Sequence, residues 1–325
     1  MHTTQRESVF FGARSISFIV ALLVVVTMIF AWRMPEVAAE PQRLFSTPED
    51  ALKALAEAVK AKDRAALGQI FGPSAKELRS GDEVQAGTEF EEFAKNLTEK
   101  TNLVKESDSK VILKMGNENW PFPIPIVRKN DQWFFDTEAG KEEILNRRIG
   151  ENELIAILVC RTYVKAQREY ALKDREGDGV IKYAQKLRSD PGKKNGLFWR
   201  NEPGEELSPF GELVARARME GYRKGKGKAV FREEPVPFHG YYFKILTRQG
   251  NNAPGGKYSY VINGNMVGGF ALVASPSDWG NSGVMTFIVN QAGKVYQKNL
   301  GPKTMKIAQE MKGFDPDKTW ALVKE

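Results

Sequence analysis

Three prolines occupy alternate positions inside one apolar run, and this run constrains the fold more than any other stretch of the chain. Residues 120–127 read WPFPIPIV. In a strand, alternate residues share a face and send their N–H groups to one side, so all three missing donors would lie along one edge. The pattern predicts an edge strand whose large apolar side chains face a core, paired with QWFFD at residues 132–136. The alternative, a proline-rich recognition ligand, would leave those apolar side chains without a core.

The segments before this run predict helices and then a sheet. The stretch TPEDALKALAEAVKAKDRAALGQIFGP opens with Thr47 as an N-cap and stops at a Gly–Pro pair. A further helix is expected over residues 88–98 and a strand over residues 110–115, KVILKM. Asp82 and Asp108 fall in polar, loop-like contexts.

The stretch from FSTPEDALKALAEAVKAKDRAALGQIFGP to WFFDTEAGKEEIL resembles the nuclear-transport-factor-2-like and cystatin-like domains. The resemblance implies a small α+β cone with an internal pocket. Enzymes of that group place Asp, His or Tyr inside the cone, and this part of the chain contains no histidine. The resemblance therefore implies a pocket without naming its chemistry.

The N-terminus predicts export. Basic residues precede an uncharged apolar run over residues 15–32, and Val-Ala-Ala follows at residues 37–39. A signal peptide over residues 1–39 is the first interpretation, and an uncleaved inner-membrane anchor is the second. In both cases the rest of the chain, after a linker over residues 40–46, would lie in the periplasm or the outer cell envelope. Contact with the membrane is expected only through an uncleaved N-terminus.

The second half predicts another α+β domain. A boundary at residues 149–150 would separate a domain of residues 47–148 from one of residues 149–325. A helix of about twenty residues is expected from residue 151 onward, and shorter helices are expected over residues 179–187 and 212–219. Strands are expected at GYYFKIL, GGFALVAS, GVMTFIVN and KVYQKNL, with a hairpin turn at Gly293.

This half has a resemblance of its own. The segments AILVCRTYVKAQREYA, HGYYFKIL and GGFALVASPSDWGNSGVMTFIVNQAGKVY are similar to the globular part of type IV pilins and type II secretion pseudopilins. The resemblance implies a helix packed on an antiparallel sheet. The combination of WPFPIP, DGVIKYAQK, DPGKKNGLFW and SGVMTFIVN looks like an exported bacterial family known only as a domain of unknown function. The expected fold is thus α+β in two domains, a cone followed by a pilin-like domain.

An acidic loop is the one candidate metal site. Asp174, Glu176 and Asp178 alternate before a glycine, and Val180 could add its carbonyl, which is the spacing of a calcium loop. Lysine and glutamine stand at the ninth and twelfth positions, where a calcium loop needs further oxygen ligands. A weak calcium site and a solvated turn that caps the next helix both remain open. No other cofactor is predicted.

The residue types that carry nucleophilic or acid–base chemistry are scarce. His239 is the only histidine beyond the export segment, and Cys160 is the only cysteine. Cys160 lies in a dense apolar pattern that predicts a buried side chain, whereas His239 precedes a strand. No Ser-His-Asp set or histidine metal cluster can be assembled. No catalytic residue is therefore assigned.

Two kinds of surface residue are candidates for partner contact. Arg223, Lys224, Lys226 and Lys228 concentrate positive charge in one loop, which would suit an anionic lipid or glycan or would simply be solvated. The net charge of +7 is spread along the chain and indicates no nucleic-acid partner.

The other kind is a pair of loop tryptophans, Trp199 and Trp279. Each is either a lid over a core or a contact for a partner. The leading hypothesis is a non-catalytic envelope protein that binds or assembles with an envelope protein or an anionic glycan or lipid. A cone-pocket hydrolase or isomerase and an accessory subunit of a secretion or pilus-type system are the alternatives.

Overall fold

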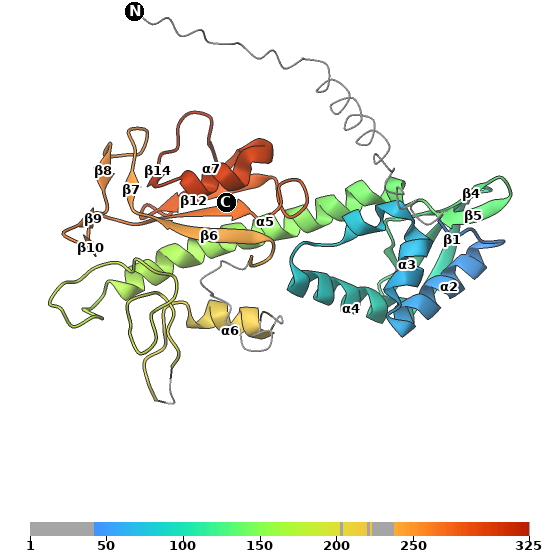
Figure 1. Ribbon diagram of the computed structural model, residues 1–325, viewed down its shortest axis with the longest axis horizontal. Helices are drawn as coiled ribbons and strands as arrows, with labels where there is room; N and C mark the ends of the chain where they lie inside the picture. Colours follow the sequence, from blue (N-terminus) through green and yellow to red (C-terminus); the bar gives the residue numbers. More distant parts are fainter. Residues whose placement is uncertain (1–41, 202–203, 220–221, 223–236, 325) are drawn as a thin grey trace, which may run out of the picture. The chain divides into compact units, whose positions relative to one another are not determined.

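Helices with strong N-caps begin the described chain. The computed structural model describes residues 42–201, 204–219, 222 and 237–324 (Figure 1). Helix α2 (Pro48–Ala61) starts at Thr47, whose hydroxyl accepts the N–H of Asp50 as predicted. The chain turns at Lys62, with φ of 52°, and Asp63 caps a separate helix, so the expected first helix is two. The elements that follow are α3 (Arg64–Phe71), η1 (Pro73–Leu78) and α4 (Glu83–Glu99).

A largely hairpin-connected antiparallel sheet follows these helices. Its strands are β1 (Thr101–Ser107), β2 (Lys110–Met115), β3 (Trp120–Pro121), β4 (Ile126–Lys129) and β5 (Gln132–Phe135). The strand order is β1-β2-β4-β5, and β3 also pairs with β2. The strand predicted at residues 110–115 is confirmed, and its alternating burial places Val111, Leu113 and Met115 in the core.

The prediction that residues 120–127 form an edge strand is wrong, whereas the predicted pairing with residues 132–136 is confirmed at Ile126 and Val127. The prolines interrupt the ladder, so the run divides into β3 and β4, and β4 pairs on both sides, with β2 and β5. Between the prolines, a backbone N–H group can still form an isolated hydrogen bond. The N–H of Phe122 donates to the carbonyl of Leu113 at 2.7 Å. The prediction of an inward apolar face holds for Phe122, Ile124 and Ile126, whereas Trp120 is 52% exposed.

One long helix joins the two parts of the sequence. Helix α5 (Thr137–Tyr170) has 34 residues and begins at an Asp136 cap. The helix expected from residue 151 thus starts fourteen positions earlier, and no loop interrupts it at residues 149–150. Phe45, in the predicted linker, exchanges backbone hydrogen bonds with Trp133 and belongs to the first core.

A second antiparallel sheet packs against the C-terminal half of α5 (Figure 1). Its strand order is β15-β13-β12-β11-β6. These strands are β6 (Tyr241–Leu246), β11 (Ala271–Pro276), β12 (Met285–Asn290), β13 (Val295–Asn299) and β15 (Ala321–Leu322). The four predicted strands are β6, β11, β12 and β13, and Gly293 takes a φ of +79° in the hairpin, as expected.

Short elements complete the described fold. Two smaller sheets contain β7 (Arg248–Gln249), β8 (Tyr258–Ser259) and β14 (Gly313–Phe314), and β9 (Val261–Ile262) with β10 (Asn265–Met266). The remaining helices are α6 (Gly211–Met219), η2 (Gly301–Lys303) and α7 (Thr304–Glu310). The predicted helix at residues 179–187 does not form, because Tyr183 instead pairs with Met266 across an isolated bridge.

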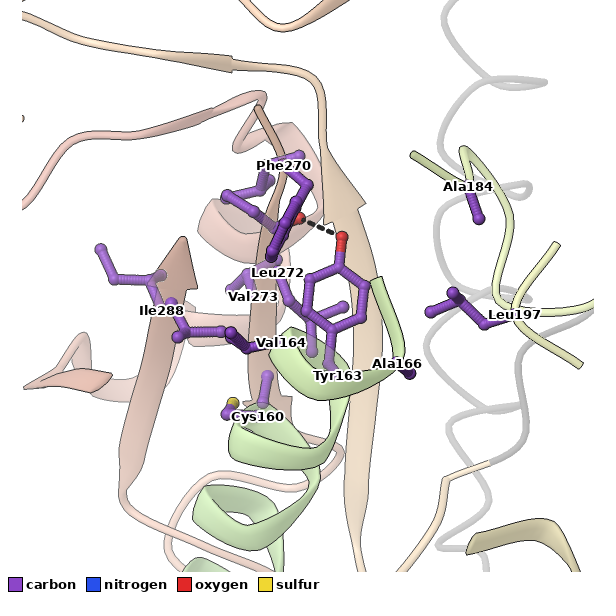
Figure 2. Packing of buried hydrophobic residues seen from close by; sticks show 14 of the residues in the cluster. Cys160, Tyr163, Val164, Ala166, Ala184, Leu197, Phe270, Leu272, Val273 and Ile288 are labelled. Atoms are coloured by element: carbon purple, nitrogen blue, oxygen red, sulfur yellow. Dashed lines mark hydrogen bonds between the residues drawn. The ribbon is translucent and has the colours of Figure 1, made fainter. Parts of the chain in front are cut away.

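Two hydrophobic clusters lie within one compact unit, Pro41–Glu325. The first cluster contains residues between Phe45 and Phe135. The second contains residues between Ala156 and Phe314, and Figure 2 shows α5 side chains packed against Ile288 and Leu272 in it. The α+β class with mainly antiparallel sheets is confirmed. The cone-like and pilin-like identities of the two parts remain predictions.

Candidate functional site

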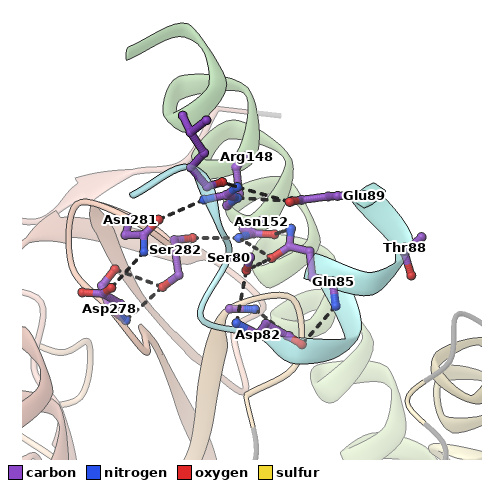
Figure 3. Close-up of polar contacts among 12 residues, drawn as sticks. Ser80, Asp82, Gln85, Thr88, Glu89, Arg148, Asn152, Asp278, Asn281 and Ser282 are labelled. Atoms are coloured by element: carbon purple, nitrogen blue, oxygen red, sulfur yellow. Dashed lines mark hydrogen bonds and ion pairs between the residues drawn. The ribbon is translucent and has the colours of Figure 1, made fainter. Parts of the chain in front are cut away.

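Buried polar side chains gather where the start of α4, the middle of α5 and the loop before β12 meet (Figure 3). They come from segments far apart in sequence. We call this group the junction cluster, and its members are Ser80, Asp82, Gln85, Glu89, Arg148, Asn152 and Ser282. All except Glu89 are buried. Buried polar groups must be satisfied by partners, so the bonds in this cluster determine what it can do.

Asp82 is the centre of the cluster and uses both carboxylate oxygens. As the N-cap of α4, its Oδ1 accepts the N–H groups of Val84 at 3.0 Å and Gln85 at 3.2 Å. Its Oδ2 accepts the hydroxyl of Tyr222 at 2.8 Å and the N–H of Gly240 at 3.3 Å. Asp82 lies in the loop before α4, as its polar context suggested, but its side chain is buried rather than exposed.

An amide pair connects α4 with α5. The Nε2 of Gln85 donates to the Oδ1 of Asn152 at 2.7 Å, and the Nδ2 of Asn152 donates to the carbonyl of Ser282 at 2.9 Å. The hydroxyl of Ser80 donates to the Oε1 of Gln85 at 2.8 Å. Asn152 therefore links a helix of the first part to a loop of the second part.

Arg148 lies one turn earlier on the same face of α5. Its Nε and Nη2 donate to the two carboxylate oxygens of Glu89, each at 3.2 Å, and its Nη1 donates to the Oδ1 of Asn281 at 3.0 Å. Nη2 also donates to the carbonyl of Leu78. The side chain of Arg148 is only 3% exposed, against 40% for Glu89. Partial burial raises the pKa of Glu89, while the Arg148 guanidinium opposes this rise.

Gly240 allows the second sheet to approach the cluster closely. Its φ is +67°, which favours glycine. A Cβ at this position would lie 2.7 Å from the Cβ of Ser282 and 2.9 Å from the Nδ2 of Asn152. The junction cluster is therefore closely packed on this side.

The backbone of His239 is linked to the junction cluster by hydrogen bonds. Its N–H donates to the hydroxyl of Tyr222 at 2.9 Å, so a chain of two hydrogen bonds connects the His239 backbone to Asp82. The imidazole makes ring contacts with Phe238 and Tyr222, at centroid distances of 4.6 and 5.2 Å. His239 thus adjoins a buried carboxylate, which its position before a strand did not indicate.

Cys160 is buried in the second hydrophobic cluster (Figure 2). Desolvation raises the pKa of its thiol to about 12. The thiolate is the nucleophilic form of cysteine, so this thiol is poorly suited to nucleophilic chemistry near neutral pH.

The acidic loop is held by protein donors. Asp174 accepts the N–H groups of Glu176, Gly177 and Gly179 at 2.8–3.1 Å, and the bond from Gly179 is the main cause of its lowered pKa. The ammonium group of Lys182 pairs with Asp178 and lies 3.4 Å from the Oε1 of Glu176.

The geometry of this loop differs from that of a calcium loop. A protein cation lies between two of the expected ligands, and Val180 contributes its N–H to Asp178. Across the described residues, no group of three histidine, cysteine or acidic side chains could hold a metal ion. Calcium binding by this loop stays a prediction.

The loop tryptophans differ from each other. Trp199 is 5% exposed and its ring lies against Arg175 and Lys194, so it covers a core. Trp279 is 37% exposed, and its Nε1 donates to the Oδ1 of Asn299 at 3.0 Å. Contact of Trp279 with a partner stays a prediction. Arg223, Lys224, Lys226 and Lys228, together with the predicted signal peptide or anchor, lie outside the described residues.

The junction cluster was missed because its partners are distant in sequence. The sequence did contain one signal of the cluster. Arg148 and Asn152 are four residues apart and extend the buried face of α5 that Ala156, Val159 and Tyr163 form. Polar residues in the apolar register of a helix indicate a buried network.

These features define an α+β protein with two cores and a buried polar junction. A family model matches residues 42–323, and the chain belongs to this family, the proteins of unknown function called DUF2950. No curated protein and no solved structure matches the chain. In the part of the chain that the structure describes, no helix combines the length and apolar character needed to cross a membrane.

Proposed function

We propose that this chain is a non-catalytic binding or assembly protein of the cell envelope. The observation that best supports this is the use of the buried acidic groups. Asp82 accepts four hydrogen bonds from the protein itself. A general base needs a lone pair directed at a substrate proton, and these oxygens are directed at the fold instead.

Glu153 follows the same pattern. Its Oε1 accepts the N–H groups of Val284 at 3.0 Å and Met285 at 2.9 Å, so it fixes the start of β12. The raised pKa of Cys160 also disfavours its thiolate. Asp82, Glu153 and Cys160 thus contribute to the fold rather than to a reaction. We therefore look for the binding function among the exposed side chains.

The surface we assign to binding includes the Trp279 loop. This loop is anchored by three bonds at its base, in which Ser282 Oγ accepts the N–H of Asp278 and donates to its carbonyl, and Asn281 Nδ2 donates to Asp278. An exposed aromatic ring on an anchored loop binds a partner at low entropic cost. The partner would be an envelope protein or an anionic glycan or lipid.

The test is retention on envelope components. The full chain is incubated with envelope extract and, separately, with vesicles of anionic phospholipid, and bound protein is measured for wild type, Trp279→Ala and Leu322→Ala. Leu322 is a matched control because it is also exposed and apolar. We expect Trp279→Ala to lose retention while its melting temperature stays unchanged. Equal retention of all three proteins would contradict the role of Trp279.

A cone-pocket hydrolase or isomerase is the second candidate, favoured by the Asp82, Tyr222 and His239 arrangement. Turnover of a hydrolase or isomerase substrate that is lost in Tyr222→Phe, without loss of stability, would put the enzyme first. An accessory subunit of a secretion or pilus-type system is the third candidate, favoured by α5 packed on β11 and β12.

A further inference from the structure

The outward face of α5 carries an ordered stripe of exposed residues. They recur at alternating spacings of four and three positions. The members of this α5 stripe are Arg147, Glu151, Leu154, Leu158, Arg161, Lys165 and Arg168. Residues at these spacings share one face of a helix, and such a face becomes a seam between two helices where its residues are apolar. The opposite face of the helix is already buried, through residues such as Ala156, Cys160 and Tyr163.

The middle of the α5 stripe is apolar. Leu154 is 69% exposed and Leu158 is 43% exposed, one helical turn apart. Single exposed leucines are common on protein surfaces, but the outward face of a helix is usually polar. Two leucines on adjacent turns of one seam form a contact patch for an apolar partner.

The charges on the two sides of this patch are opposite, so two copies of the helix could pair them. Glu151 and Arg161 lie at equal distances, in opposite directions, from the midpoint between the two leucines. Both are exposed, and neither forms an ion pair with another described residue within 4.0 Å. Two copies of α5 packed antiparallel about that midpoint would place Leu154 against Leu158, and Glu151 against Arg161, twice each.

A parallel arrangement fits poorly. It would place each charged residue of the stripe opposite its own copy, which is repulsive. The antiparallel arrangement brings Arg147 opposite Lys165 only at the rim, where solvent and salt screen the repulsion. We propose that two copies of this chain associate through antiparallel packing of the α5 stripe. This interface is isologous, as in most homodimers, and it does not depend on the proposed binding function.

The test is a charge swap in the full chain, purified in mild detergent and measured by sedimentation over a range of concentrations. Each single variant, Glu151→Arg or Arg161→Glu, creates two like-charge contacts and should weaken dimerisation by about tenfold or more. The double variant restores opposite charges and should recover the wild-type dissociation constant within about threefold. Glu142→Arg is the matched control, since Glu142 is exposed on α5 but lies off the stripe.

Two further readouts keep the test decisive. Dimerisation should weaken as salt is added, because exposed charge pairs are screened. Leu154→Lys should abolish it while circular dichroism stays unchanged. A monomer at all concentrations, a dimer insensitive to both single reversals, or a double variant as weak as the singles would overturn the proposal. Association through the apolar N-terminal residues would give the second of these results.

Discussion

Replacing Asn152 by leucine tests whether the junction cluster holds the two parts of the protein together. Leucine has a similar size but removes the amide hydrogen bonds of this fully buried side chain with Gln85 and with the carbonyl of Ser282. Each partner left without a bond costs about 1–3 kcal/mol. Burial of the leucine returns part of this, about 2 kcal/mol. We expect a net loss of about 2 kcal/mol in the free energy of unfolding.

The measurement is thermal unfolding followed by circular dichroism, with urea unfolding as a second readout. A loss of this size should lower the melting temperature by about 3 °C for a chain of this length. Asn146→Leu is the control, because Asn146 is exposed on the same helix, and such changes shift stability by less than about 0.5 kcal/mol. Equal melting temperatures for the two variants would refute the role given to Asn152.

Three other predictions follow from charged and thiol groups. Partial burial raises the pKa of Glu89, so the folded state favours the protonated carboxyl group. The contribution of protonated Glu89 to the stability of the fold is therefore complete below the unfolded pKa. It is lost as the pH rises through the folded pKa. The stability of wild type relative to Glu89→Gln should therefore increase from about pH 8 to about pH 4 in urea titrations, and a flat difference would contradict this. Cys160 should react with thiol reagents only after unfolding, since burial raises its pKa to about 12, and rapid labelling of the native protein would oppose that. Lys182→Gln should bind calcium more tightly than wild type in calorimetry, because the Lys182 ammonium neutralises Glu176 and Asp178, and identical titrations would show that it does not compete.

Local patterns predicted individual elements well. The strand at Lys110–Met115 was predicted with its observed ends, because alternating burial gives a period of two. Helix α2 was located by its Thr47 cap and its proline in the first turn. The start of α4 was missed although Asp82 and Gln85 have the spacing of a capping signal.

Features that depend on competition between local and tertiary effects were predicted poorly. Gly150 was interpreted as a boundary, yet one glycine at an exposed helical position costs only about 1 kcal/mol, which the packing of α5 outweighs. The prolines were correctly expected to remove ladder donors. The sheet accommodates that loss by breaking the strand in two rather than by placing it at an edge.

The junction cluster could not be derived from local patterns. Its bonds join residues as far apart as Asp82 and Gly240, which are 158 positions apart. No periodicity of one segment specifies such a pairing. Only the polar residues Arg148 and Asn152 on the buried face of α5 pointed to a network, and they did not identify its partners.

Native-state hydrogen exchange along α5 tests most directly whether this helix and the junction cluster join the two cores into one unit. The amides before residue 148 belong to the part beside the first core, and those after residue 156 to the part beside the second. A joined unit predicts that the protected amides of both stretches open with free energies within about 1 kcal/mol of each other, and that Asn152→Leu separates them. If the first stretch in the wild-type protein opens several kcal/mol more easily than the second, the two cores are independent and the junction cluster does not couple them.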